Sequence, residues 1–196
     1  TTSAVNFSGD IHEQLYLENG NTLIIAKGTT IMDLSSYFFN GTQGSTQTKV
    51  TSNIIQEFDN LGNLVFEWNS LDHLHPDEFV DGFSYDPNKF DYAHINSIEI
   101  DDDGHLLISV RHLSSCVKIN HNTGDVIWRL GGELSDFTFN GSGIPFLGEH
   151  DFRRHPNRDT YSLFDNSNIS AGGIESRAIE YELDTINWTA TETWVY

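Results

Sequence analysis

Three stretches of the sequence follow one plan, and this internal repeat limits most strongly what the chain can fold into. Each stretch has a histidine in its first apolar segment, then a polar turn, two further apolar segments and a segment that contains tryptophan. The stretches span residues 10–70, 91–132 and 148–196. The aligned histidines are His12, His94 and His150, and the aligned tryptophans are Trp68, Trp128 and Trp194.

The segments alternate with turns in the manner of antiparallel β-structure. Short runs rich in Ile, Val, Leu, Phe and Tyr, such as NLVFEW and HLLISV, are separated by turn signals such as DDDG and NTG. Helical periodicity is scarce. We therefore predict an all-β chain that is built from four-stranded antiparallel units.

Four strands per unit with a recurring tryptophan are typical of a β-propeller, in which a large aromatic fills the gap between neighbouring blades. We predict that residues 1–196 form three blades of a single propeller. Since propellers typically have about four to eight blades, either further blades complete the ring or copies of the chain assemble around an axis. We favour further blades over a homo-oligomer. A β-sandwich with coincidental tryptophans is the alternative fold.

The composition argues against two kinds of partner. The formal net charge is −19, from 29 acidic and 10 basic residues, and such a surface repels nucleic acid and anionic membranes. No apolar run approaches the ~20 residues that a membrane-spanning helix requires. We therefore expect neither nucleic-acid binding nor insertion into a membrane.

The aligned histidines are the candidate catalytic residues. The innermost strands of a propeller line its central channel, so we expect His12, His94 and His150 to meet near one end of it. Core packing gives no reason to prefer histidine at this position three times. Because residues of a strand alternate between faces, Asn96 is expected beside His94. Arg111, which ends the following strand, has a planar fork that suits sulfate, phosphate or carboxylate, although a salt bridge would also explain it.

Long connections and two minor motifs complete the pattern. We expect residues 28–49, 71–90 and 130–148 to be functional loops or lids, because long loops without regular structure are uncommon. His73 and His75 would bind a metal only beside a carboxylate, and we predict no metal site there. The turn at 101–104 is expected to be a solvated hairpin turn rather than a calcium site.

Several blocks of the sequence resemble the arylsulfotransferase family, from about Asp10 to Tyr196. They include DYAHINSIEIDDDGHLLISVRHLSSCVKINHNTGDVIWRLGG, GEHDFRRHP and SRAIEYELD. The resemblance implies a six-bladed propeller, exported to the periplasm or beyond, that moves a sulfuryl group from an aryl sulfate to a phenol without a nucleotide donor, a metal or another cofactor. It implies that His150 is the nucleophile. It also implies that His12, His94, Asn96 and Arg111 bind the sulfate or assist the leaving group.

One position departs from the family pattern. Glu149 precedes His150 where the resemblance leads us to expect glutamine, and a carboxylate beside an imidazole favours the protonated ring, which cannot attack. Two other functions therefore stay open on the sequence. One is a non-catalytic propeller that binds an anionic or aromatic ligand or another protein, and the other is a sulfate-ester hydrolase.

Overall fold

The protein is an all-β chain in a computed structural model, which describes residues 4–141, 145–167 and 175–196. Within the described residues, strands β1 to β15 are accompanied by three short 3₁₀ helices, which confirms the predicted fold class. The chain divides into two compact units, residues 1–95 and residues 96–196. Each unit is described by itself below, and the single-domain propeller remains a prediction.

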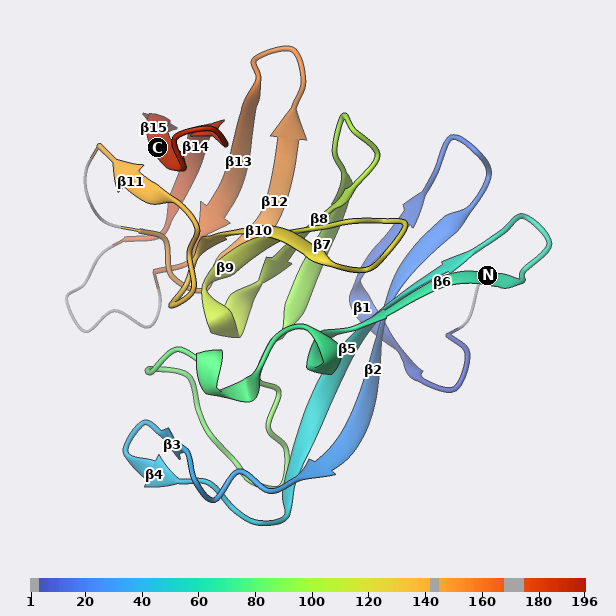
Figure 1. The fold of residues 1–196 in the computed structure, drawn as a ribbon, viewed down its shortest axis with the longest axis vertical. Coiled ribbons are helices and arrows are strands. Elements are labelled where there is room, and N and C mark those ends of the chain that lie inside the picture. Colours follow the sequence, from blue (N-terminus) through green and yellow to red (C-terminus); the bar gives the residue numbers. More distant parts are fainter. Residues whose placement is uncertain (1–3, 142–144, 168–174) are drawn as a thin grey trace. The chain divides into compact units, whose positions relative to one another are not determined.

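The first unit contains one four-stranded antiparallel sheet (Figure 1). Its strands lie side by side in the order in which they occur along the chain. Its strands, in spatial order, are β1 (Ser8–Tyr16), β2 (Thr22–Met32), β5 (Thr48–Phe58) and β6 (Leu64–Asn69). Strands β2 and β5 pair without interruption from Thr22 opposite Phe58 to Met32 opposite Thr48. The pairing of β1 with β2 is interrupted between Gly9 and Gln14.

Part of the predicted loop at residues 28–49 is strand, so that prediction was wrong in extent. Residues 28–32 continue β2 and residues 48–49 begin β5, which lengthens this hairpin. The β-branched residues of GTTIM and TKVT favour such an extended pair. The remaining insertion carries a small hairpin of β3 (Phe38–Phe39) and β4 (Thr42–Gln43).

The connection at residues 71–90 is ordered by aromatic packing. It begins within the short helix η1 (Ser70–Asp72) and contains the short helix η2 (Pro76–Glu78). The ring centroid of Phe90 lies 4.7 Å from that of Phe39 and 5.0 Å from that of Phe79. The backbone N–H of Phe90 donates to the carbonyl oxygen of Lys49, and the N–H of Thr51 donates to that of Phe90, which fastens the end of the connection to β5.

The second unit contains two sheets (Figure 1). The strands of one are β7 (Ile95–Ile100), β8 (Leu106–Val110), β9 (Ser115–Ile119) and β10 (Val126–Gly131), of which only Ile95 precedes the unit boundary. The antiparallel strands of the other are β12 (His150–His155), β13 (Thr160–Asp165), β14 (Arg177–Asp184) and β15 (Thr189–Val195). The predicted four-stranded antiparallel units are thus confirmed. A fifth strand, β11 (Thr138–Asn140), pairs in parallel with β15 and was not predicted.

Trp128 fills the space between the two sheets of the second unit. Its ring meets those of Phe137, Tyr161 and Phe152 edge-on, with centroids 5.5, 6.2 and 6.4 Å away. The rings of Trp128, Phe137 and Phe152 belong to one buried cluster, against which Tyr161 packs. The cluster also contains Leu107, Leu163 and Ile179. Trp128 therefore has the role predicted for the recurring tryptophan, whereas the side chain of Trp194 is 51% exposed.

Gly131 ends β10 with a φ of 81°, a conformation that residues with a side chain rarely adopt. A Cβ atom at this position would lie 2.6 Å from the ring of Phe146 and 2.8 Å from the carbonyl oxygen of Ser114. The glycine therefore allows the chain to leave β10 directly against the buried cluster.

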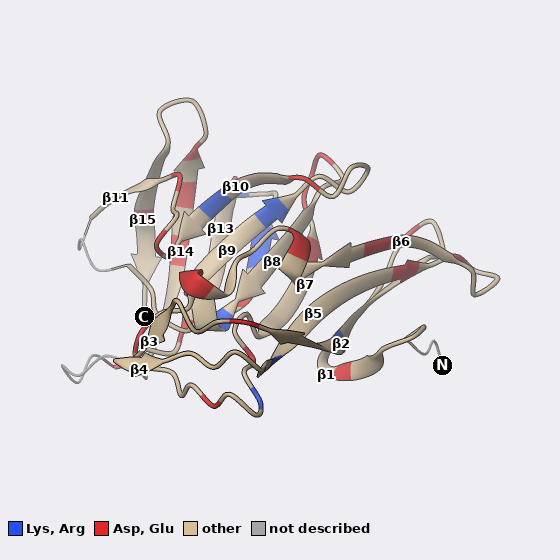
Figure 2. Ribbon diagram, turned by 60° about the horizontal axis from the view of Figure 1, so that its bottom comes forward, with Lys and Arg blue, Asp and Glu red and all other residues tan. Residues whose placement is uncertain are grey.

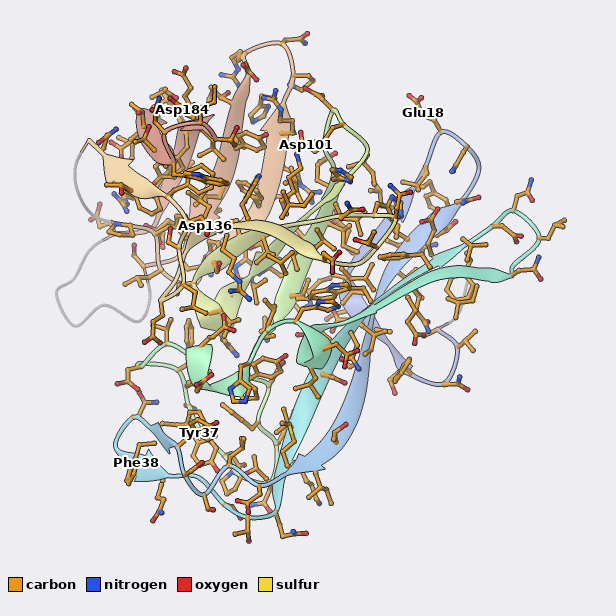
Figure 3. All side chains as sticks on the ribbon, viewed as in Figure 1. Glu18, Tyr37, Phe38, Asp101, Asp136 and Asp184 are labelled. Atoms are coloured by element: carbon orange, nitrogen blue, oxygen red, sulfur yellow. The ribbon has the colours of Figure 1, made fainter. Side chains whose placement is uncertain are left out.

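Acidic residues occur on both units, as Figure 2 shows. In the sequence, 29 acidic residues stand against 10 basic ones. Glu18, Asp101 and Asp184, which Figure 3 labels, lie at hairpin turns of the three sheets. Among the described residues, no helix has the length and apolar character needed to cross a bilayer.

Candidate active site

Two of the three aligned histidines lie in the first unit, at irregular points of the backbone. His12 lies where the pairing of β1 with β2 is interrupted. His94 immediately precedes β7 and has a φ of 56°. The prediction that His94 shares a strand face with Asn96 was therefore wrong, because this left-handed residue breaks the alternation.

Each of these histidines is held through Nδ1 by an aspartate of the same unit. Nδ1 of His12 lies 2.5 Å from Oδ1 of Asp10, and Nδ1 of His94 lies 3.0 Å from Oδ2 of Asp91. The two imidazole rings meet edge to face with their centroids 5.1 Å apart. Nδ1 of each ring is therefore engaged by a carboxylate, which orients the imidazole.

Lys27 of β2 joins the two histidine–aspartate pairs. Its Nζ atom lies 3.0 Å from Asp10 and 3.3 Å from Asp91. Burial alone would raise the pKa of Asp10, but hydrogen bonds from the His12 backbone and from Lys27 outweigh it, so this pKa is lowered. Burial opposes the charge of Lys27, yet the two carboxylates outweigh that effect and raise its pKa. The five side chains therefore form one charged cluster, which we call the dyad cluster.

Asn53 of β5 anchors the backbone at His94. Its Oδ1 atom accepts a hydrogen bond of 3.1 Å from the backbone N–H of Ile95, and its own backbone N–H donates to Ser70 at 2.9 Å. Asn53 is completely buried. The strained residue His94 is thus held in place by the sheet of its own unit.

The third aligned histidine, His150, begins β12 in the second unit and faces an amide. Nδ2 of Asn166 lies 2.8 Å from Nδ1 of His150. An amide nitrogen can only donate, so in this orientation Nδ1 accepts and the proton of a neutral ring lies on Nε2. With the amide of Asn166 inverted, its oxygen would accept from Nδ1, and Nε2 would carry the lone pair. Either way, the group that faces Nδ1 of His150 is neutral, unlike the carboxylates that face Nδ1 of His12 and His94.

Asn96 holds the backbone on both sides of His150. Its Nδ2 atom donates to the carbonyl oxygen of Glu149 at 2.9 Å, and its Oδ1 atom accepts from the backbone N–H of Asp151 at 3.3 Å. Asp151 has a φ of 60°, so the chain turns sharply after the histidine. Asn96 is therefore placed beside His150 within the second unit.

The side chain of Glu149 points into the protein. Its Oε1 atom accepts hydrogen bonds from the backbone N–H of Val110 at 3.1 Å and from Oγ of Ser109 at 3.2 Å. The residue is completely buried, and burial raises its pKa to about 7 although these hydrogen bonds lower it.

Arg111 lies outside the strand on which the sequence placed it. Strand β8 ends at Val110, and Arg111 begins the 3₁₀ helix η3 (Arg111–Leu113). Its Nη1 atom lies 2.7 Å from Nε2 of His112. Because a guanidinium group only donates, His112 accepts this hydrogen bond with a neutral ring nitrogen. The prediction that Arg111 ends this strand was therefore wrong by one residue.

Several site residues were missed by the sequence reasoning. They are Asp10, Lys27, Asp91, His112 and Asn166. A signal existed for the aspartates, because Asp10 and Asp91 lie two and three residues before the aligned histidines. Lys27 and Asn166 are brought to their histidines only by strand pairing, so no local pattern marks them.

The minor motifs have structural roles. The ring of His73 stacks on Trp68 with centroids 5.1 Å apart, and His75 caps the N-terminus of η2. In the turn at 101–104, Asp101 and Asp103 bind Nζ of Lys118 at 2.6 and 2.7 Å. A lysine ammonium group thus already occupies these carboxylates, so we assign them no metal.

The structure places His12 and His94 together in one unit, and His150 with Asn96 and Arg111 in the other. Repeated four-stranded antiparallel sheets, each with an aligned histidine in or just before its first strand, define an all-β protein. The model of the arylsulfotransferase (ASST) family matches residues 2–194, and the chain belongs to this family.

Comparison with solved structures gives a distant likeness. The crystal structure of a protein of unknown function from Bacteroides caccae shares 12% sequence identity with this chain, at a TM-score of 0.46. The match covers 93% of this chain and 65% of the other. The chain thus spans less than two thirds of that protein. No curated protein matches this chain.

Proposed function

We propose that the chain is the histidine-bearing part of an aryl-sulfate sulfotransferase that transfers a sulfuryl group from an aryl sulfate to a phenol. In this proposal, His150 forms a covalent sulfohistidine, and His12 and His94 act on the same sulfuryl group as acids. Asn96 and Arg111 donate hydrogen bonds to its oxygens. The family to which the chain belongs supports the reaction class.

The observation that carries the assignment of roles is the difference between the Nδ1 partners of the three histidines. Asp10 and Asp91 hold His12 and His94, whereas the amide of Asn166 holds His150. A carboxylate stabilises the positive charge of an imidazolium, which suits a proton donor. A neutral partner does not, and this suits a nucleophile that must keep a lone pair. The role of nucleophile therefore falls to His150.

In the first step, the lone pair on Nε2 of His150 attacks the sulfur atom. The S–N bond forms while the S–O bond to the aryl oxygen breaks, and the departing phenolate takes a proton from His12 or His94. For Nε2 to carry the lone pair, the Asn166 amide is turned so that its oxygen accepts the Nδ1 proton. Because charge on three sulfuryl oxygens must be stabilised, each preorganised donor is expected to contribute about 2–4 kcal/mol.

In the second step, a phenol attacks the sulfur of the sulfohistidine. Its proton passes to the imidazole that lost one in the first step, and the electron pair of the S–N bond returns to His150. Asn96 has a second N–H beside the one that binds Glu149, and Arg111 has a fork of donors, so both suit the sulfuryl oxygens. The enzyme returns to its starting state without a nucleotide or a metal.

Incubating the protein with a chromogenic aryl sulfate and a phenol tests this proposal. We expect release of the first phenol together with sulfation of the second, and loss of both in His150→Ala. His121→Ala, in the turn after β9, is the matched control and should keep the activity. Phenol release that does not depend on the acceptor would replace transfer by hydrolysis. Ligand binding without any turnover would favour a non-catalytic propeller.

The ring and the location of the enzyme are further parts of the proposal. A six-bladed propeller needs more than the three blades described, supplied by further chain or by copies of this one. Light scattering on the purified protein distinguishes a monomer from a homo-oligomer. Export to the periplasm or beyond is the location that the family resemblance implies, and cell fractionation tests it.

A further inference from the structure

Glu149, the residue before His150, is hydrogen-bonded to the end of strand β8. Its side chain accepts hydrogen bonds from Val110 and Ser109. Oγ of Ser109 also lies 3.2 Å from the carbonyl oxygen of Glu149, to which Asn96 donates as well. The side chain and the backbone of Glu149 are therefore both held by hydrogen bonds. Through these bonds, Glu149 connects the start of β12 to Val110, the residue before Arg111.

One oxygen of this carboxyl group has no hydrogen-bond partner among the described residues. Oε2 of Glu149 is buried without one, whereas Oε1 has two. An ionised carboxylate normally accepts hydrogen bonds on both oxygens, and an unsatisfied buried charge is costly. The site therefore accommodates the neutral acid better than the anion, which agrees with the raised pKa of about 7.

The charged and titratable groups around Glu149 come from several elements. Asp165 of β13 raises the pKa of Glu149 in addition to burial, and Asp165 is itself paired with Arg177 at 2.7 Å. Cys116 of β9 has its thiol pKa raised by burial and by the charge of Glu149. Arg111 and His112 follow Val110 in η3, and His150 and Asp151 follow Glu149 in the chain. Of these groups, the carboxylate of Asp165 opposes ionisation of Glu149.

We propose that Glu149 is a positioning residue for sulfuryl transfer, and that its protonated form supports attack by His150 whereas its ionised form suppresses it. This inference rests on the proposed function. An ionised Glu149 would place a negative charge next to the nucleophile, where an anionic sulfate ester must bind. The same charge would favour the imidazolium of His150, which has no lone pair to attack. Both effects lower the rate as Glu149 loses its proton.

The variant Glu149→Gln keeps the size and the hydrogen-bond acceptor of the side chain but cannot ionise. Transfer rates of the wild type and the variant are compared over a range of pH with the same aryl sulfate and phenol. Titrations that are independent of Glu149 affect both proteins alike, so they cancel in the quotient of the two rates. Glu182→Gln, on the exposed face of β14, is the matched control.

We expect the quotient of the Glu149→Gln rate to the wild-type rate to rise about tenfold, from one pH unit below the transition to one unit above it. The control variant should show no such change relative to the wild type. A merely structural role of Glu149 would change the rate by a constant factor at every pH. A quotient that is constant across pH would therefore overturn the inference while leaving the proposed function intact.

Failure of the proposed function has a different signature. If the wild type transfers no sulfuryl group at any pH, the proposed function falls and this inference falls with it. Carbonyl infrared absorption of the wild type minus Glu149→Gln then reports separately whether the acid is protonated near neutral pH. Absence of a protonated-carboxyl band below the transition overturns the inference even in an active enzyme.

Discussion

The amide nitrogen of Asn166 lies 2.8 Å from Nδ1 of His150, so the proposed nucleophile faces a neutral partner. In the first unit, the equivalent atoms of His12 and His94 face Asp10 and Asp91. The group that faces Nδ1 is therefore a neutral amide for one histidine and a carboxylate for the other two.

Replacing the neutral partner by a charged one should suppress the nucleophile. In Asn166→Asp, we expect the acidic limb of the pH–rate profile to move upward by about one pH unit, because a carboxylate stabilises the imidazolium of His150. The profile of the transfer rate measures this shift. Asn122→Asp, in the turn after β9, is the control and should leave the profile in place. An unchanged profile in Asn166→Asp would remove Asn166 from the account.

Lys27 should matter to both histidines of the dyad cluster. In Lys27→Met, the carboxylates of Asp10 and Asp91 lose the cation that joins them, and we expect the free energy of unfolding to fall by about 1–2 kcal/mol. We also expect the transfer rate to fall about tenfold to a hundredfold, the range seen when residues that orient an active histidine are lost.

Chemical denaturation and transfer assays measure the two effects. Lys89→Met removes an exposed lysine of the same unit and should change neither quantity. A Lys27→Met protein with wild-type activity would show that the cluster does not support the reaction.

Glu149 should make stability depend on pH. Its pKa is about 7 in the folded protein and 4.5 as a free side chain, so the folded state holds a proton that the unfolded state has lost between these values. Stability from this group is complete below the unfolded value and is lost as the pH rises through the folded one. The loss should be roughly 3 kcal/mol.

Urea denaturation at a series of pH values measures this loss. Glu149→Gln should show a correspondingly smaller decline over the same range, whereas Glu182→Gln should follow the wild type. Parallel curves for the wild type and Glu149→Gln would show that Glu149 does not titrate there.

The tryptophans should differ sharply although they occupy aligned positions. Trp128 is 3% exposed and packed between two sheets, whereas Trp194 is 51% exposed. We expect Trp128→Ala to lower the free energy of unfolding by about 3–5 kcal/mol, and Trp194→Ala to lower it by no more than about 1 kcal/mol. Denaturation followed by circular dichroism tests the comparison. Equal losses would contradict the packing described for Trp128.

The all-β fold and the four antiparallel strands of each large sheet were predictable, because alternating apolar segments and turn residues are local signals. The parallel pairing of β11 with β15 was not, since it joins segments that are distant in sequence and three residues carry little pattern.

The candidate site was predictable as a set of repeated histidines but not in its details. His94 and Arg111 left their expected strand positions because the strands start at Ile95 and end at Val110. Strand ends depend on tertiary contacts, such as the hydrogen bonds of Asn53 and Glu149, which local sequence does not show. Lys27 and Asn166 lie beside their histidines only after the sheets have formed.

Trapping the covalent intermediate tests the central claim most directly. The protein is mixed with an aryl sulfate in the absence of an acceptor, quenched at alkaline pH and digested, and the peptides are analysed by mass spectrometry. The account predicts that the peptide with His150 gains the mass of one sulfuryl group, and that a phenol acceptor removes it. Release of phenol with no adduct on His150, or an adduct on another residue that persists in His150→Ala, would contradict the account.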